Sequence, residues 1–157
     1  MDGNGKRSFM ERTTPALAGA TILVADDEPA LLRLMSFVLQ KQGYCMLTAS
    51  NGEEALGIVR ECRPDLVVLD IMMPRMDGFE VARAIRSEPE IADTPIVMLS
   101  AKAQDEDIER GLSCGVDTYI TKPFAPEQLA QVVADLLRGE RAASVINGET
   151  ISNRAVA

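Results

Sequence analysis

Residues 65–78 read DLVVLDIMMPRMDG, and this stretch contains the strongest single clue to the fold. Four consecutive apolar residues, Leu66 to Leu69, are typical of a short parallel strand that is covered on both faces. The run ends in Asp70, where an uncompensated charge next to a buried strand would be costly. Asp77 before Gly78 then predicts the start of a helix. The stretch therefore indicates a buried strand, a carboxylate at its end and a helix that follows.

The same alternation of strand and helix patterns extends outward in both directions along the chain. We expect the other strands at four short apolar or β-rich runs: Thr21 to Ala25, Tyr44 to Ala49, Pro95 to Leu99 and Asp117 to Ile120. Strands that alternate with helices imply right-handed crossovers and a doubly wound parallel sheet of the α/β class. Ligands of such sheets bind beyond the carboxyl ends of the strands.

The segments between the strands begin with helix-start signals and carry apolar residues at helical spacing. The start signals are Pro29 after Asp26-Asp27-Glu28, Asn51, Asp77, Asp105 to Asp107, and Pro126-Glu127. Two segments place their apolar residues on one face, namely Leu31, Leu34, Met35, Val38 and Leu39 in the first, and Leu129, Val132, Val133, Leu136 and Leu137 in the last. Five βα units follow from this pattern.

Length and composition favour one domain with a tail at each end. The chain has 157 residues, of which 46% are hydrophobic, enough for a single core. The segments 1–19 and 139–157 are polar and lack a steady period, so we expect a domain over 20–138 between two tails. No run resembles a signal peptide or a membrane span, and we expect a cytoplasmic location.

Charge and cysteine content disfavour several function classes. The net charge of −8 disfavours direct binding to nucleic acid or to an anionic membrane. The three cysteines, Cys45, Cys62 and Cys114, form no CxxC pair, and the chain has no histidine to complete a zinc site. We interpret these cysteines as reduced packing residues.

Five polar residues stand at the ends of four predicted strands: Asp26, Asp27, Asp70, Ser100 and Lys122. Because the carboxyl ends of parallel strands lie at one edge of the sheet, we expect these side chains to converge. Three crowded carboxylates repel one another unless a cation neutralises them, and Mg²⁺ is the best candidate because it prefers oxygen ligands.

Each of these residues alone has an ordinary structural explanation. The run Asp26-Asp27-Glu28 could simply stabilise a helix start, Lys122 could be a solvated charge, and Ser100 could form a turn. The order of the residues across four strand ends is what favours a phosphoryl site.

The quoted residues resemble the receiver domains of two-component response regulators over roughly Ala20 to Arg138. The resemblance is carried by four pieces of sequence: Ile22 to Glu28, Asp65 to Gly78, Pro95 to Ala101 and Tyr119 to Phe124. It implies a flavodoxin-like (βα)5 fold with strand order 2-1-3-4-5. It also implies that a partner histidine kinase or phosphotransfer protein supplies the phosphoryl group, and that the chain is not an enzyme with a metabolic role but a switch that slowly dephosphorylates itself.

The resemblance also assigns roles to individual residues. It implies that Asp70 is the phosphoacceptor, that Asp27 and Asp70 ligate Mg²⁺ directly with help from Asp26, and that Met72 offers its backbone carbonyl to the metal. It further implies that Ser100 and Lys122 contact the phosphoryl group, and that Tyr119 is a switch whose ring turns inward in the active state. The Lys122-Pro123 bond is often cis in this family.

The output and the wider context stay open at the level of sequence. The face made by the fourth helix, fifth strand and fifth helix, roughly Asp105 to Arg138, is the candidate surface for a downstream protein or a self-dimer. The chain could be a diffusible regulator, a phosphorelay intermediate, or the receiver part of a longer transcriptional regulator. Two other classes remain: an aspartate-nucleophile phosphatase, which would need an acid where Met72 stands, and a scaffold that works without phosphorylation.

Overall fold

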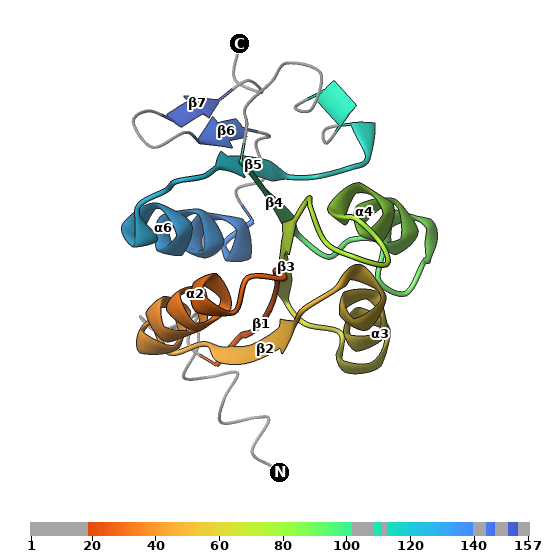
Figure 1. The fold of residues 1–157 in the computed structure, drawn as a ribbon, viewed down its shortest axis with the longest axis horizontal. Coiled ribbons are helices and arrows are strands. Elements are labelled where there is room, and N and C mark those ends of the chain that lie inside the picture. Colours follow the sequence, from red (N-terminus) through yellow and green to blue (C-terminus); the bar gives the residue numbers. More distant parts are fainter. Residues whose placement is uncertain (1–18, 102–108, 111–112, 140–143, 147–150, 154–157) are drawn as a thin grey trace.

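A mainly parallel sheet forms the centre of the molecule, with helices on both faces (Figure 1). The structure, a computed structural model, describes residues 19–101, 109–110, 113–139, 144–146 and 151–153. The first five strands lie in the order β2-β1-β3-β4-β5, and all pairs among them are parallel. Their bounds are Thr21–Ala25 (β1), Cys45–Ala49 (β2), Leu66–Asp70 (β3), Ile96–Ser100 (β4) and Thr118–Thr121 (β5). The predicted doubly wound sheet and its strand order are confirmed.

Among the residues that the structure describes, two long helices cover each face of the sheet. Helices α2 (Pro29–Lys41) and α6 (Pro126–Leu137) pack on one face, and α3 (Gly52–Cys62) and α4 (Gly78–Ser87) pack on the other (Figure 1). The inner strands β3 and β4 are buried at every residue, as their unbroken apolar runs predict. None of the described helices is both long and apolar enough to span a bilayer.

Most of the predicted helix starts have the expected local chemistry. The Asn51 side chain accepts a hydrogen bond from the Glu54 amide at 2.8 Å, and Asp77 forms a reciprocal capping box with Glu80. Pro29 opens α2, but no side chain caps this helix. The predicted start at 105–107 lies outside the described residues.

The predicted apolar face of α2 is only partly correct. Met35 and Leu39 are buried against the sheet, whereas Leu34 is 45% exposed. Successive helical positions turn by about 100°, so Leu34 lies at the margin of the stripe that Met35 and Leu39 centre on the core. The corresponding face of α6 is buried at Leu129, Val132, Val133 and Leu136.

The sheet continues beyond the five predicted strands. Residues Ser144–Ile146 (β6) pair in parallel with β5, and Ile151–Asn153 (β7) pair antiparallel with β6. The sequence predicted only a polar tail after Gly139, because three-residue strands are too short to show a period.

Candidate functional site

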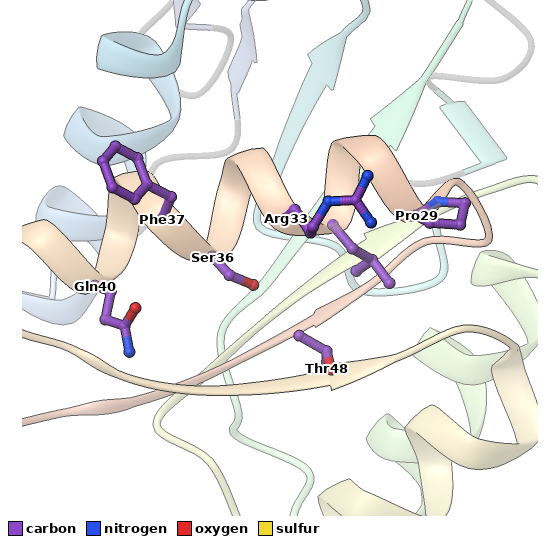
Figure 2. A pocket seen from close by; sticks show the side chains of 7 residues that line it. Pro29, Arg33, Ser36, Phe37, Gln40 and Thr48 are labelled. Atoms are coloured by element: carbon purple, nitrogen blue, oxygen red, sulfur yellow. The ribbon is translucent and has the colours of Figure 1, made fainter.

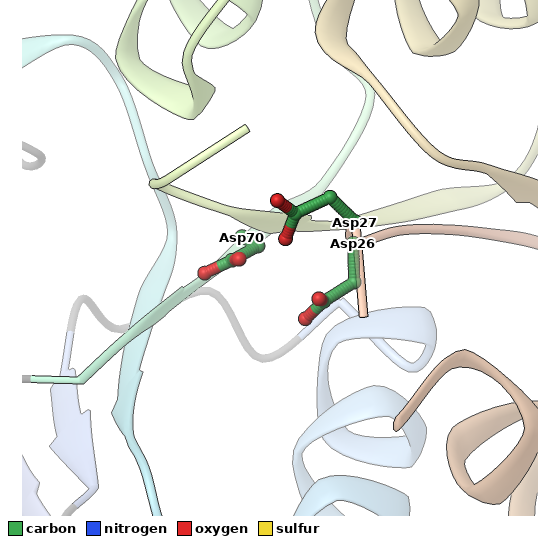
Figure 3. Close-up of side chains that lie close together, drawn as sticks. All are labelled: Asp26, Asp27 and Asp70. Carbon is green, nitrogen blue, oxygen red and sulfur yellow. The ribbon is translucent and has the colours of Figure 1, made fainter. Parts of the chain in front are cut away.

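Three carboxylates converge at the carboxyl edge of the sheet (Figure 3). Asp26 and Asp27 follow β1, and Asp70 is the last residue of β3, the strand next to β1. One oxygen of each side chain lies within 4.8 Å of the others. Asp26 is fully buried and Asp70 is 4% exposed, whereas Asp27 is exposed. The cluster therefore has a buried floor and one carboxylate that faces solvent.

The ammonium group of Lys122 lies against the two buried carboxylates. Its Nζ is 3.2 Å from Asp26 Oδ2 and 3.4 Å from Asp70 Oδ1. Lys122 directly follows β5, and its peptide bond to Pro123 is cis. The shorter contact is to Asp26, and no sequence signal distinguishes Asp26 from Asp70 as a partner of Lys122.

Burial and crowding set the charge state of the cluster. Burial raises the pKa of Asp70 to about 6, the negative charge of Asp26 adds to the rise, and Lys122 partly opposes it. Burial disfavours the ammonium form of Lys122, but the charges of Asp70 and Asp26 outweigh this and raise its pKa. Lys122 is therefore charged at neutral pH. Asp70 is also ionised at neutral pH, although burial and the charge of Asp26 disfavour its ionised form.

The second oxygen of Asp26 is also in use. Asp26 Oδ1 accepts a hydrogen bond from the Glu28 backbone amide at 2.9 Å, while Oδ2 faces Lys122. This pair of contacts holds the Asp26 carboxylate in one orientation. Asp27 has the greater access to solvent and to an incoming ligand.

Ser100, at the end of β4, lies at the same edge of the sheet. It is 6% exposed and follows Leu99, which is the register partner of Asp70. The Lys122 backbone amide donates to the Ser100 carbonyl at 2.7 Å, so β4 and the segment after β5 are joined at this point. Ser100 and Lys122 thus lie at the same edge of the sheet as Asp70, the first at the end of β4 and the second just after β5.

Tyr119 lies within β5, and its ring is fully buried among the residues that α3 and α4 pack on. Thr121, two residues further along β5, is also buried and is the register partner of Ser100. Thr121 was not among the predicted site residues.

The backbone at Gly78, the first residue of α4, lies very close to the backbone of Asp70. A Cβ atom on Gly78 would lie 2.6 Å from the Asp70 carbonyl oxygen, so only glycine fits there. The Gly78 amide donates to the Ile71 carbonyl at 2.9 Å. Met72, in this loop, is 71% exposed. The sequence placed Gly78 only at a helix start; its preceding Asp77 gave no signal of the close approach.

The donor set fits a hard divalent cation. All three side chains offer carboxylate oxygens, which Mg²⁺ and Ca²⁺ prefer, and their spacing lets them approach one ion. Burial is the main cause of the raised pKa of Asp70, the negative charge of Asp26 adds to it, and a cation at the cluster would offset both effects. Asp27 and the exposed loop at Met72 leave one side of the cluster open to water and to a further ligand.

A hollow elsewhere on the surface is a weaker candidate. It lies between α2 and β2, and Figure 2 shows Pro29, Arg33, Ser36, Phe37, Gln40 and Thr48 along it. Arg33 is the one ionisable side chain in its lining. The hollow therefore lacks the converging acidic and basic groups that a reaction needs.

The comparisons with known proteins agree on one family. The sequence model of the family described as "Response regulator receiver domain" matches residues 22–134. The chain is 46% identical over 123 residues to the alkaline phosphatase synthesis transcriptional regulatory protein PhoP of Bacillus subtilis, a match to 78% of this chain and 50% of that protein. It is 45% identical over 120 residues to the DNA-binding response regulator MtrA of Mycolicibacterium smegmatis, covering 76% and 51%. The chain spans about half the length of these curated relatives.

Solved structures give the same fold. The chemotaxis protein CheY4 of Vibrio cholerae is 35% identical with a TM-score of 0.71, and the match covers 74% of this chain and 98% of that one. The receiver domain of the Francisella response regulator 1452 is 32% identical with a TM-score of 0.72, covering 76% and 98%. The receiver domain of a histidine kinase from Syntrophus aciditrophicus is 34% identical with a TM-score of 0.73, covering 77% and 92%.

Proposed function

This chain belongs to the response regulator receiver family, a family of phosphoacceptor signalling modules, and from this premise we propose that Asp70 accepts a phosphoryl group from a partner histidine kinase or phosphotransfer protein. The observation that carries the proposal is the position of Lys122, whose Nζ lies 3.4 Å from Asp70 Oδ1 and 3.2 Å from Asp26 Oδ2. This arrangement sets a buried carboxylate nucleophile beside a fixed positive charge.

Asp26, Asp27 and Asp70 are the residues that would hold Mg²⁺, with the Met72 backbone carbonyl as a further ligand from the exposed loop. When bound, the ion supplies positive charge to the phosphoryl oxygens. Asp26 is buried and fixed by two contacts, which suits a supporting ligand, whereas Asp27 faces solvent and Asp70 lies beside it in the cluster.

In the proposed reaction an oxygen of Asp70 attacks phosphorus in line with the leaving imidazole nitrogen of the donor. The phosphorus-nitrogen bond breaks, a phosphorus-oxygen bond to Asp70 forms, and the imidazole leaves with the bonding electron pair and takes up a proton. Lys122 shifts from the carboxylate to a phosphoryl oxygen and neutralises its charge. Attack by water on the same phosphorus would break its bond to the Asp70 oxygen and release phosphate, and this slow step would limit the lifetime of the signal.

The structural response would pass through Ser100 and β5. Ser100 lies next to Asp70 across the sheet, and its carbonyl accepts the Lys122 amide, so a group bound between Asp70 and Lys122 acts on both strands. Tyr119 lies three residues before Lys122 and is packed in the core. We assign the output surface to β5, α6 and the segment that precedes β5, where a downstream protein or a second copy would bind.

A phosphatase and a phosphorylation-independent scaffold fit the site less well. A phosphatase of the aspartate-nucleophile type would need a general acid at position 72, which is an exposed methionine. A scaffold would not need the buried charges of Asp26 and Asp70 beside the half-buried Lys122, which are costly to keep together. Whether the chain acts alone, in a relay or as part of a longer transcriptional regulator does not change the chemistry at Asp70.

The test uses phosphoramidate, a small donor with a phosphorus-nitrogen bond, in place of the unidentified kinase. We expect one phosphoryl adduct by intact mass in the presence of Mg²⁺, none with a chelator, and none in Asp70→Asn. Asp135→Asn on the outer side of α6 is the matched control and should react as the wild type does. Equal modification of the wild type and Asp70→Asn would reject the proposal.

A further inference from the structure

The C-terminal hairpin formed by β6 and β7 covers what would otherwise be a free edge of the sheet. β6 pairs with β5 at three register positions, Thr118 with Ser144, Tyr119 with Val145 and Ile120 with Ile146. All four residues of β5 are buried. β2, the edge strand on the opposite side, has two exposed and two half-buried residues among its five. In this structure β5 is therefore an inner strand, and the free edge has moved to β7 (Figure 1).

The crossover from β5 through α6 to β6 has the opposite hand to the usual right-handed crossover of parallel strands. The chain moves across the sheet in the same direction from β3 to β4 and from β5 to β6. The helix between β3 and β4 is α4, on one face, whereas the helix between β5 and β6 is α6, on the other (Figure 1). The two parallel crossovers therefore have opposite hands. Right-handed crossovers are strongly preferred, so β6 is held by pairing that its own connection does not favour.

The pairing itself is also short. β6 and β7 have three residues each, compared with five in β1 to β4. Parallel pairing is slightly weaker per residue than antiparallel pairing, and a segment held by few backbone hydrogen bonds opens before the core does. The hairpin is thus the part of the sheet that detaches most readily.

We infer that the hairpin is a displaceable cover of the β5 edge, which has to leave before a second copy of the chain can pair with that edge. An uncovered strand presents a row of unpaired backbone groups, and the same edge of a second copy can pair with it antiparallel about a two-fold axis. The cover thus competes within one chain with association between chains. The inference concerns the output surface and does not require that Asp70 accepts a phosphoryl group.

Proline at position 145 in the full-length chain tests the cover. Val145→Pro removes a backbone amide from the middle of β6 and breaks its pairing, and Ala155→Pro, two positions along the sequence after the last residue of β7, is the matched control. Amide hydrogen exchange should show that the amides of residues 118–121 that point toward β6 lose protection in Val145→Pro and keep it in the control, whereas those that point toward β4 stay protected in both. Sedimentation without any phosphoryl donor should show that Val145→Pro dimerises at a lower concentration than the wild type.

Two results would overturn the inference. Unchanged protection of residues 118–121 in Val145→Pro would mean that β6 does not cover β5. If residues 118–121 lose protection in Val145→Pro but this variant dimerises no more readily than the wild type, the hairpin does not compete with a second copy for the β5 edge. The phosphoramidate experiment is independent, since a missing adduct would refute the proposed chemistry and leave both of these measurements as they are.

Discussion

Replacing Asp70 by asparagine should stabilise the metal-free protein at neutral pH. The side chain keeps its shape but loses a charge that is buried beside Asp26. The rise of the Asp70 pKa from 3.8 to about 6, at about 1.4 kcal/mol per unit, corresponds to about 3 kcal/mol of strain in the ionised form. Lys122 loses one of its two partners in the variant, so we expect a net gain of about 1 to 3 kcal/mol.

The sign of the effect depends on pH in a defined way. The folded protein holds a proton on Asp70 up to about pH 6, whereas the unfolded chain releases it near pH 3.8. The contribution of Asp70 to the free energy of unfolding therefore falls as the pH rises from about 4 to about 6, and stays low above that range. Below about pH 4 both states bind the proton, and the wild type and Asp70→Asn should differ little in this contribution.

The assay is urea unfolding followed by circular dichroism, with a chelator, at several values between pH 4 and pH 7. Glu61→Gln, which removes one exposed negative charge on α3, is the matched control. Its free energy of unfolding should change with pH in the same way as that of the wild type. Adding Mg²⁺ at pH 7 should stabilise the wild type and not Asp70→Asn. An advantage of Asp70→Asn that is the same at pH 4 and pH 7 would refute the argument from buried charge.

Three further outcomes are expected. Lys122→Ala should still accept a phosphoryl group at Asp70 but lose the change in amide exchange of β5 that phosphorylation causes in the wild type. Gly78→Ala should cost about 1 to 3 kcal/mol in urea unfolding, because its Cβ would lie 2.6 Å from the Asp70 carbonyl oxygen, whereas Gly57→Ala, with no atom nearby, should gain up to about 1 kcal/mol. Arg86→Met should cost about 2 to 4 kcal/mol by the same assay, because the guanidinium donates to three backbone carbonyls and a carboxylate; a smaller loss would show that these contacts contribute little.

The strands were predictable because their signal is local. Unbroken apolar runs such as Leu66 to Leu69 mark strands with two covered faces, and the predicted bounds differ from the observed ones by about one residue. Asp70 is the last residue of its strand, as expected, whereas Ser100, expected just after Leu99 ends the fourth strand, proved to be the last residue of β4. That shift still leaves the side chains at the same edge of the sheet.

Other features depend on contacts between distant segments and could not be predicted. Leu34 fits the helical period but lies at the margin of the buried stripe, which only the packing of α2 on the sheet decides. The pairing of Lys122 with Asp26 joins residues 96 positions apart. The close approach of Gly78 to the Asp70 carbonyl needs the shape of the loop, and β6 and β7 are too short to show a pattern.

Locating the phosphoryl group is the most direct test of the central claim. The wild-type chain would be treated with phosphoramidate and Mg²⁺, digested at low temperature, and its peptides sequenced by mass spectrometry. The account predicts that the group lies on Asp70 and on no other residue. A phosphoryl group on Asp26 or Asp27, or no modified peptide at all, would contradict it.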